Sequence, residues 1–149
     1  MKPRLGIFAA ALWWGSLSTI GFLVVPMLFA HLPTPAIAGA MAGKLFSAGC
    51  WVTLPCGLLL VMLLRASVDE EDRLEAAAQL TLGIVAAGML MALLQEFAVS
   101  PRILARENLK LWHSVGTGLY LAQWLCATAV LWRLATTRAS APPPSPRAG

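Results

Sequence analysis

The stretch LGIFAAALWWGSLSTIGFLVVPMLFA, residues 5–30, contains no Lys, Arg, Asp or Glu over 26 consecutive positions. Three more charge-free stretches follow, at residues 45–64, 76–95 and 111–132. A helix needs about 20 largely apolar residues to cross the roughly 30 Å hydrocarbon core of a bilayer. One charge at the centre of such a helix would cost about 2.5–3.5 kcal/mol on insertion scales. The pattern therefore predicts an all-α membrane protein with four transmembrane helices in an antiparallel bundle.

The composition of the whole chain excludes an ordinary soluble domain. Its 149 residues are 58% apolar and carry only 11 basic and 7 acidic side chains, with a mean hydropathy of +0.73. We expect a transmembrane domain at residues 1–134 and a disordered, Pro-rich cytoplasmic tail at 135–149. The first span is expected to be retained, because it is longer than the roughly 7–15 apolar residues of a signal peptide. The expected spans lie at about 5–30, 37–64, 76–97 and 108–133.

Two Thr/Ser-Pro pairs indicate helix starts, because Thr and Ser cap helices and proline is favoured at the first helical position. Thr34-Pro35 predicts the start of the second helix, and Ser100-Pro101 predicts a fourth helix that runs from Pro101 to about Trp132. The segment TPAIAGAMAGKLF (34–46) also aligns without gaps to SPRILARENLKLW (100–112). This match favours two repeated helical hairpins related by an axis along the membrane normal. The alternative is that both segments use the same capping and anchoring chemistry independently.

The distribution of Lys and Arg predicts the orientation. Seven of these residues lie on the side that carries both termini, and Lys44, Arg102, Arg106 and Lys110 lie on the opposite side. Because the cytoplasmic side is normally the richer in Lys and Arg, we expect both termini in the cytoplasm. The expected location is the cell inner (plasma) membrane, with the lipid bilayer as the principal partner and a homo-oligomer or membrane partner as further candidates.

The minority basic residues are the leading candidates for a binding site. If the fourth helix is continuous from Pro101, Arg102, Arg106, Lys110 and His113 share an arc of about 80° at 100° per residue. Like charges that are stacked in this way favour an anionic ligand or an acidic partner. We expect a site for lipid headgroups, an anion or a partner at the outer face, with Lys44 and Glu96 completing it. The alternative is that the basic side chains only anchor the helices at the headgroups.

Other functions have less support in the sequence. His31 and His113 at the outer boundary suggest a haem- or copper-binding redox protein as an alternative, but neither has further ligands near it, so no metal or cofactor is expected. A small oligomeric transporter is a third interpretation and requires a continuous polar path past Tyr120 and Gln123. No catalytic motif occurs, so we expect no enzyme. Nucleic-acid binding is not expected, because the +4 charge is divided between two membrane faces.

Small and polar residues inside the spans predict how the helices pack. Gly39 and Gly43, Gly83 and Ala87, and Gly88 and Ala92 have the small-xxx-small spacing that allows helices to approach closely in lipid. The polar residues inside the spans are expected to make hydrogen bonds between helices; they include Ser16, Ser18, Thr117, Tyr120, Gln123 and Gln95. Cys50, Cys56 and Cys126 have no metal-ligand spacing and are expected to fill apolar space.

Three segments together resemble a known family. They are WWGSLSTIGFLVVPMLFAHLPTPAIAGAMAGKLF (13–46), FAVSPRI (97–103) and LKLWHSVG (109–116). They are similar to the four-pass domain of unknown function 4149 family, which is related to the transmembrane-protein-205-like proteins of eukaryotes. The similarity covers residues 5–134 and implies a four-helix integral membrane protein, with no established activity. A histidine at position 31 is not part of the family's pattern, which weakens the haem or copper alternative.

Overall fold

The computed structural model describes residues 2–65 and 72–139. The predicted all-α architecture is confirmed: these residues contain helices and no strand. Four helical segments are long and apolar enough to cross a membrane, namely Arg4–His31, Pro35–Arg65, Ala76–Leu104 and Leu109–Thr136. The prediction of a disordered tail at residues 135–149 is wrong for residues 135–139, which form the end of the last helix; its remainder, residues 140–149, lies outside the described part of the chain, as do residues 66–71.

The first and third spans each contain a π-helical turn. The first span consists of α1 (Lys2–Thr19), η1 (Ile20–Val24) and α2 (Val25–His31). The third consists of α4 (Asp72–Leu94), η2 (Gln95–Val99) and α5 (Ser100–Leu104). The second and fourth spans are single helices, α3 (Pro35–Arg65) and α6 (Leu109–Ala139). The Thr34-Pro35 helix start is confirmed, since Thr34 Oγ1 accepts a hydrogen bond from the Ile37 N–H at 3.3 Å.

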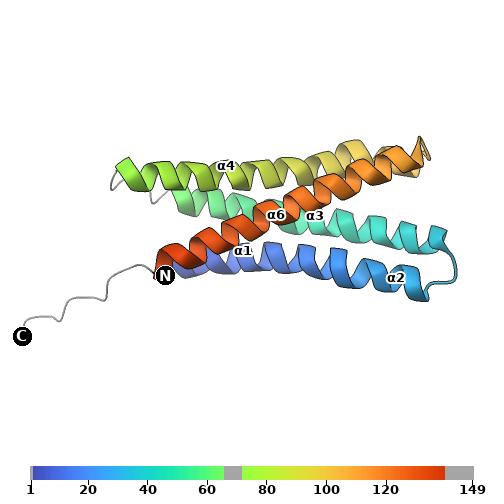
Figure 1. Ribbon diagram of the computed structural model, residues 1–149, viewed down its shortest axis with the longest axis horizontal. Coiled ribbons are helices and arrows are strands. Elements are labelled where there is room, and N and C mark those ends of the chain that lie inside the picture. The colour runs from blue at the N-terminus through green and yellow to red at the C-terminus, as the bar shows by residue number, and fades with distance from the viewer. Residues whose placement is uncertain (1, 66–71, 140–149) are drawn as a thin grey trace, which may run out of the picture.

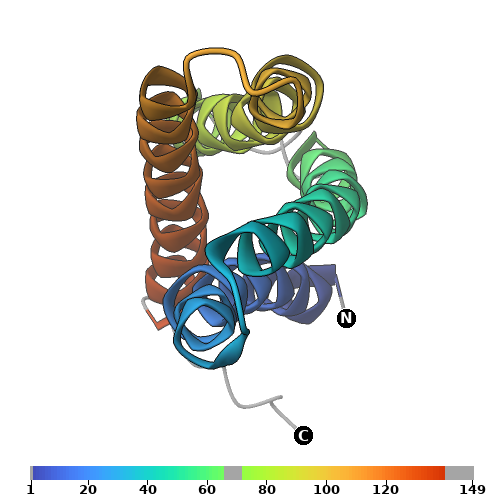
Figure 2. The same cartoon turned by 90° about the vertical axis from the view of Figure 1, so that its right-hand side faces the viewer.

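The spans alternate in direction and form a ring (Figures 1 and 2). α1 packs against α3 and α6, and α4 packs against the same two helices from the other side. We call the end of the bundle where α1 begins and α6 ends the terminal end. The opposite end, which carries residues 32–34 and 105–108, is the distal end.

The core and the outer surface are both apolar, as expected of a chain that has lipid as its solvent. Trp13, Leu60, Val85 and Val130 are fully buried at the centre of the bundle. Large apolar side chains also cover the outside, where Phe8 is 73% and Trp132 71% exposed. Such a surface would be unfavourable in water but is suited to contact with acyl chains.

The prediction that the fourth helix begins at Pro101 is wrong. α5 continues the third span as far as Leu104, a turn follows at residues 105–108, and α6 begins only at Leu109. Arg106 and Asn108 have positive φ angles of 57° and 31° in this turn, and Asn108 Oδ1 accepts a hydrogen bond from the Leu111 N–H at 3.4 Å. Pro101 is tolerated inside the span because it follows a π-helical turn, where the backbone bonding has already shifted: the Ser100 N–H donates to the Gln95 carbonyl.

Two helical hairpins repeat the same arrangement, but the aligned segments are not equivalent in the structure. Residues 34–46 lie within α3, whereas residues 100–112 extend over α5, the turn and the start of α6. The residues that are equivalent in the structure are separated by a different number of positions from the two aligned segments. η1 starts at residue 20 and η2 at residue 95, and each is followed by a proline in the second position of the next α-helix. The offset between the hairpins is therefore 75 residues at these turns, and 74 between the first residues of α3 and α6.

Contacts between equivalent residues locate an approximate twofold axis. Trp13 and Gly88 correspond by the 75-residue offset, and the Trp13 ring lies directly against Gly88. Phe46 and Tyr120 correspond by the 74-residue offset, and their rings stack edge to face with centroids 5.1 Å apart. A residue can touch its own equivalent only near the axis that relates the two halves. The axis therefore passes through the middle of the ring, close to both of these contacts.

Candidate functional site

The four basic residues of the predicted site are all exposed in the distal half of the bundle. Lys44 lies on α3, Arg102 on α5, Arg106 in the turn and Lys110 in the first turn of α6. Because the helix is interrupted at residues 105–108, the predicted continuous stripe along one helix is not formed. The basic residues instead extend over two helix ends and the turn between them.

Arg102 is the most firmly positioned of these side chains. Its guanidinium carbon lies 4.5 Å from the centre of the Trp112 ring, a cation–π contact. Its Nη1 donates a hydrogen bond of 2.7 Å to the Ala98 carbonyl. The turn at residues 105–108 folds α6 back beside α5, and this brings Trp112 under Arg102. The remaining guanidinium donors stay available to an external acceptor.

Glu96 does not join the basic residues. It lies in η2, is half-buried, and its Oε1 accepts a hydrogen bond of 2.6 Å from the Ser47 hydroxyl of α3. No ion pair between Glu96 and a basic side chain occurs among the described residues. The carboxylate therefore links the third span to the second.

The two histidines belong to different parts of the distal end. His31 Nδ1 lies 3.0 Å from the Met27 carbonyl of its own helix, and His113 Nδ1 lies 2.8 Å from the Leu109 carbonyl. α2 packs against α3 and η1, whereas α5 and η2 pack against α6. Within residues 2–65 and 72–139, no group of three or more His, Cys, Asp or Glu side chains is arranged to hold a metal ion.

Polar side chains inside the bundle connect the spans, as expected for Ser18, Tyr120 and Gln123. Trp124 Nε1 donates to Ser18 Oγ at 2.9 Å, Gln123 Nε2 donates to Thr53 Oγ1 at 3.0 Å, and the Tyr120 hydroxyl donates to the Leu17 carbonyl at 2.7 Å. The expectation is wrong for Ser16 and Thr117, whose hydroxyls donate to carbonyls of their own helices.

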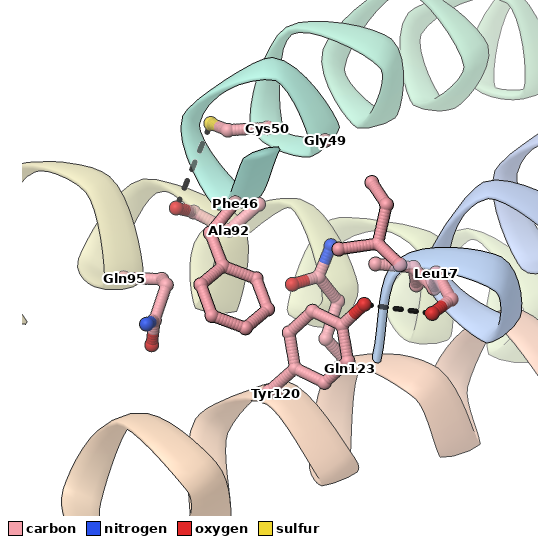
Figure 3. Close-up of a pocket in the computed structure, with 9 residues that line it drawn as sticks. Leu17, Phe46, Gly49, Cys50, Ala92, Gln95, Tyr120 and Gln123 are labelled. Carbon is pink, nitrogen blue, oxygen red and sulfur yellow. Dashed lines mark hydrogen bonds between the residues drawn. The ribbon is translucent and has the colours of Figure 1, made fainter. Parts of the chain in front are cut away.

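A small cavity lies beside the Phe46–Tyr120 pair (Figure 3). Residues of all four spans line it, and the free space in it is about what one water molecule needs. Gln95 of η2 and Tyr120 and Gln123 of α6 are among the lining residues (Figure 3). Gln95 Oε1 is buried and has no hydrogen-bond donor among the described residues.

Sequence reasoning placed Gln95 among the structural polar residues and did not identify this cavity. The sequence did contain one usable signal. VVP at residues 24–26 and VSP at 99–101 place a proline near the same end of the first and third spans. A proline inside a span interrupts the backbone hydrogen-bond pattern and is associated with kinks and π-helical turns.

Comparison with known proteins identifies a family. A sequence model described as domain of unknown function (DUF4149) matches residues 8–110. This match covers the first three spans, η2 and the turn that precedes α6. No curated protein and no solved structure matches the chain significantly.

Proposed function

The chain belongs to the DUF4149 family, and we propose that it is a non-catalytic integral membrane module whose distal end binds the headgroups of anionic phospholipids. The observation that carries the proposal is the group of exposed basic side chains Lys44, Arg102, Arg106 and Lys110 in the distal half. Phosphate is a preferred partner of such groups, since Arg offers several donors in one plane and Lys offers a compact positive charge.

The surroundings of Arg102 support a position at the membrane surface. Trp side chains are enriched at the membrane–water interface, and Trp112 is stacked under the Arg102 guanidinium. Lys44 lies nine residues into α3, or about 14 Å from its start at 1.5 Å per residue. From that depth its amine reaches the headgroups by extending toward the distal end.

The charge balance of the distal end also favours an anionic ligand. The acidic side chains near the four basic residues are Glu96 and Glu107, and Glu96 is occupied by Ser47 inside the bundle. Glu107 is exposed in the turn. The basic groups therefore have an excess positive charge, and each exposed Lys or Arg near an anionic membrane surface contributes about 1 kcal/mol of attraction.

We propose that the termini lie in the cytoplasm and that the distal end faces away from it across the inner membrane. The support is the excess of Lys and Arg in the segments at the terminal end. A lipid site at the distal end would then be in the outer leaflet.

The proposal predicts that anionic lipid binding depends on charge at the distal end. The variant R102Q/R106Q/K110Q is compared with R4Q/R65Q, which removes exposed basic residues at the terminal end. Native mass spectrometry measures phosphatidylglycerol that remains bound to the detergent-solubilised protein, with phosphatidylcholine as the neutral reference. At about 1 kcal/mol for each residue, the distal variant is expected to lose on the order of 100-fold in phosphatidylglycerol affinity.

The terminal variant serves as the control and is expected to retain distal binding. The proposal is wrong if both variants bind phosphatidylglycerol as the unmodified protein does, or if the protein never distinguishes phosphatidylglycerol from phosphatidylcholine. Equal losses in both variants would also contradict it, because they would show that only total charge matters.

A further inference from the structure

We propose that the cavity beside the Phe46–Tyr120 pair is a binding site for a small uncharged hydrogen-bond donor, and that a water molecule occupies it. We call it the axial cavity. The proposal is independent of the lipid site, which lies on the exterior of the distal half.

The lining of the axial cavity consists largely of residues that correspond between the hairpins. Ile20 of η1 and Gln95 of η2 are equivalent by the 75-residue offset, and both line the cavity. Leu17 and Ala92 are equivalent by the same offset and also line it. The cavity therefore lies on the approximate twofold axis, at the interface between the two repeats. Membrane proteins built from repeats place their ligand sites at such interfaces.

The two hairpins contribute different chemistry to this site. Where the first repeat presents the apolar Ile20 and the glycine Gly49, the second presents the amides of Gln95 and Gln123. The Gln95 amide lies against Gly116 of α6, where an added Cβ would be 3.2 Å from Gln95 Nε2 and 3.5 Å from Gln95 Oε1. The rest of the lining is largely apolar, so the Gln95 amide is the polar group on its side of the Phe46–Tyr120 pair.

The unpartnered atom determines what the cavity can hold. Gln95 Oε1 is a buried acceptor without a donor among the described residues, and such a group is unfavourable unless a water molecule or a ligand donates to it. The cavity has space for about one water. The occupant must be a donor to satisfy Oε1, and it must be uncharged because no ionised side chain lines the cavity.

The other polar groups of the lining already have partners inside the bundle, since the Gln123 amide donates to Thr53 Oγ1. The Tyr120 hydroxyl directs its proton to the Leu17 carbonyl, so it offers no proton to the cavity. The Gln123 amide is buried on the other side of the Phe46–Tyr120 pair from Gln95 (Figure 3). Two π-helical turns, a feature frequent at functional sites, supply wall residues from opposite sides.

Water contact with Gln95 tests the proposal directly. Water-edited solid-state NMR on the isotopically labelled protein in lipid bilayers measures magnetisation transfer from water to each side chain. We expect transfer to the Gln95 carboxamide well above that to Leu94, the exposed, lipid-facing neighbour. Transfer to Gln95 no greater than to Leu94 would overturn the proposal. This measurement uses the unmodified protein and does not depend on a variant folding.

A pair of substitutions gives a second, independent test. Q95M keeps the side-chain length but removes the acceptor, and L94M introduces the same side chain at the exposed neighbouring position. If the cavity is hydrated, Q95M is expected to lower the thermal melting midpoint and abolish water transfer to Tyr120, whereas L94M does neither. If Q95M is as stable as the unmodified protein or more stable, no water molecule donates to Gln95 Oε1 in the unmodified protein, and the proposal is wrong.

Discussion

Replacing Gly88 with alanine is expected to destabilise the bundle more than any other single methyl addition at a glycine. A Cβ at this position would lie 2.6 and 2.7 Å from two atoms of the Trp13 ring and 3.3 Å from Cys126 Cβ. The ring cannot move aside easily, because Trp13 is fully buried at the centre of the bundle. Overpacking of this kind costs about 1–3 kcal/mol and occasionally more. We expect a lower melting midpoint in detergent and less folded protein in the membrane.

Gly83 provides the matched control for Gly88. It lies on the same helix, and apart from its chain neighbours and the adjacent backbone of that helix, no heavy atom of the described chain lies within 4 Å of the position of an added Cβ. G83A is therefore expected to leave the melting midpoint unchanged or to raise it slightly, since alanine is the better helix former. Equal effects of G83A and G88A would show that the change in the melting midpoint comes from the effect of alanine on the helix itself and not from the contact with Trp13.

Replacing Gly21 with alanine is expected to have the second large effect. The added Cβ would lie 2.5 Å from Tyr120 Cε1 and 3.1 Å from Tyr120 Oη. The Tyr120 ring is held by its hydrogen bond to the Leu17 carbonyl and by its edge-to-face contact with Phe46. We expect a loss of about 1–3 kcal/mol, measured by thermal unfolding. G57A is expected to cost less, because its clash at 2.5 Å is with the flexible Met89 thioether.

A double-mutant cycle separates this contact from a general effect on the π-helical turn. Tyr120→Leu removes the ring atoms that an alanine at position 21 would meet, so G21A is expected to cost much less in the Y120L background than alone. The coupling free energy between the two positions should be of the order of 1 kcal/mol, as for residues in direct contact. If the two effects simply add, the clash with Tyr120 is not the cause.

The spans were predictable because a charged side chain inside the bilayer is unfavourable, so each span contains a long stretch of sequence without charged residues. The charge-free stretches at residues 5–30 and 45–64 predict two of the helices without any knowledge of packing. Ser100-Pro101 misled the prediction of the fourth helix because a proline fits both a helix start and the turn that follows a π-helical segment. Local sequence does not distinguish these two cases, since the difference lies in which carbonyl the preceding N–H reaches.

Close approaches between helices were predicted less well. Gly88 is a contact point as expected, but an added Cβ at Gly39, Gly43 or Gly83 would meet open space within the described chain. The small-xxx-small spacing identifies a face on which helices can approach, but the ring arrangement determines which faces meet. Gly21, which has no such spacing partner, is a tight contact because the Tyr120 ring of α6 lies against it.

For the site residues too, the sequence predicts the end of the molecule at which a side chain lies but not the direction in which it points. The exposed basic residues could be assigned to one end of the molecule from their place between spans, because topology alone puts them there. The inward position of Glu96 and the unsatisfied Gln95 oxygen could not, because both residues belong to η2, and a π-helical turn breaks the regular step that relates them to the basic residues beyond it. A helical wheel with a fixed 100° step therefore fails at this point.

The side of the membrane reached by each end of the bundle tests the four-span architecture most directly. In a background with Cys50, Cys56 and Cys126 replaced by alanine, single cysteines are introduced at Thr34, Glu107 and Arg4, all exposed positions. A membrane-impermeant maleimide is applied to sealed vesicles of known orientation, before and after permeabilisation. The bundle predicts that T34C and E107C react from one side and R4C from the other. Reaction of T34C and E107C from opposite sides would contradict it.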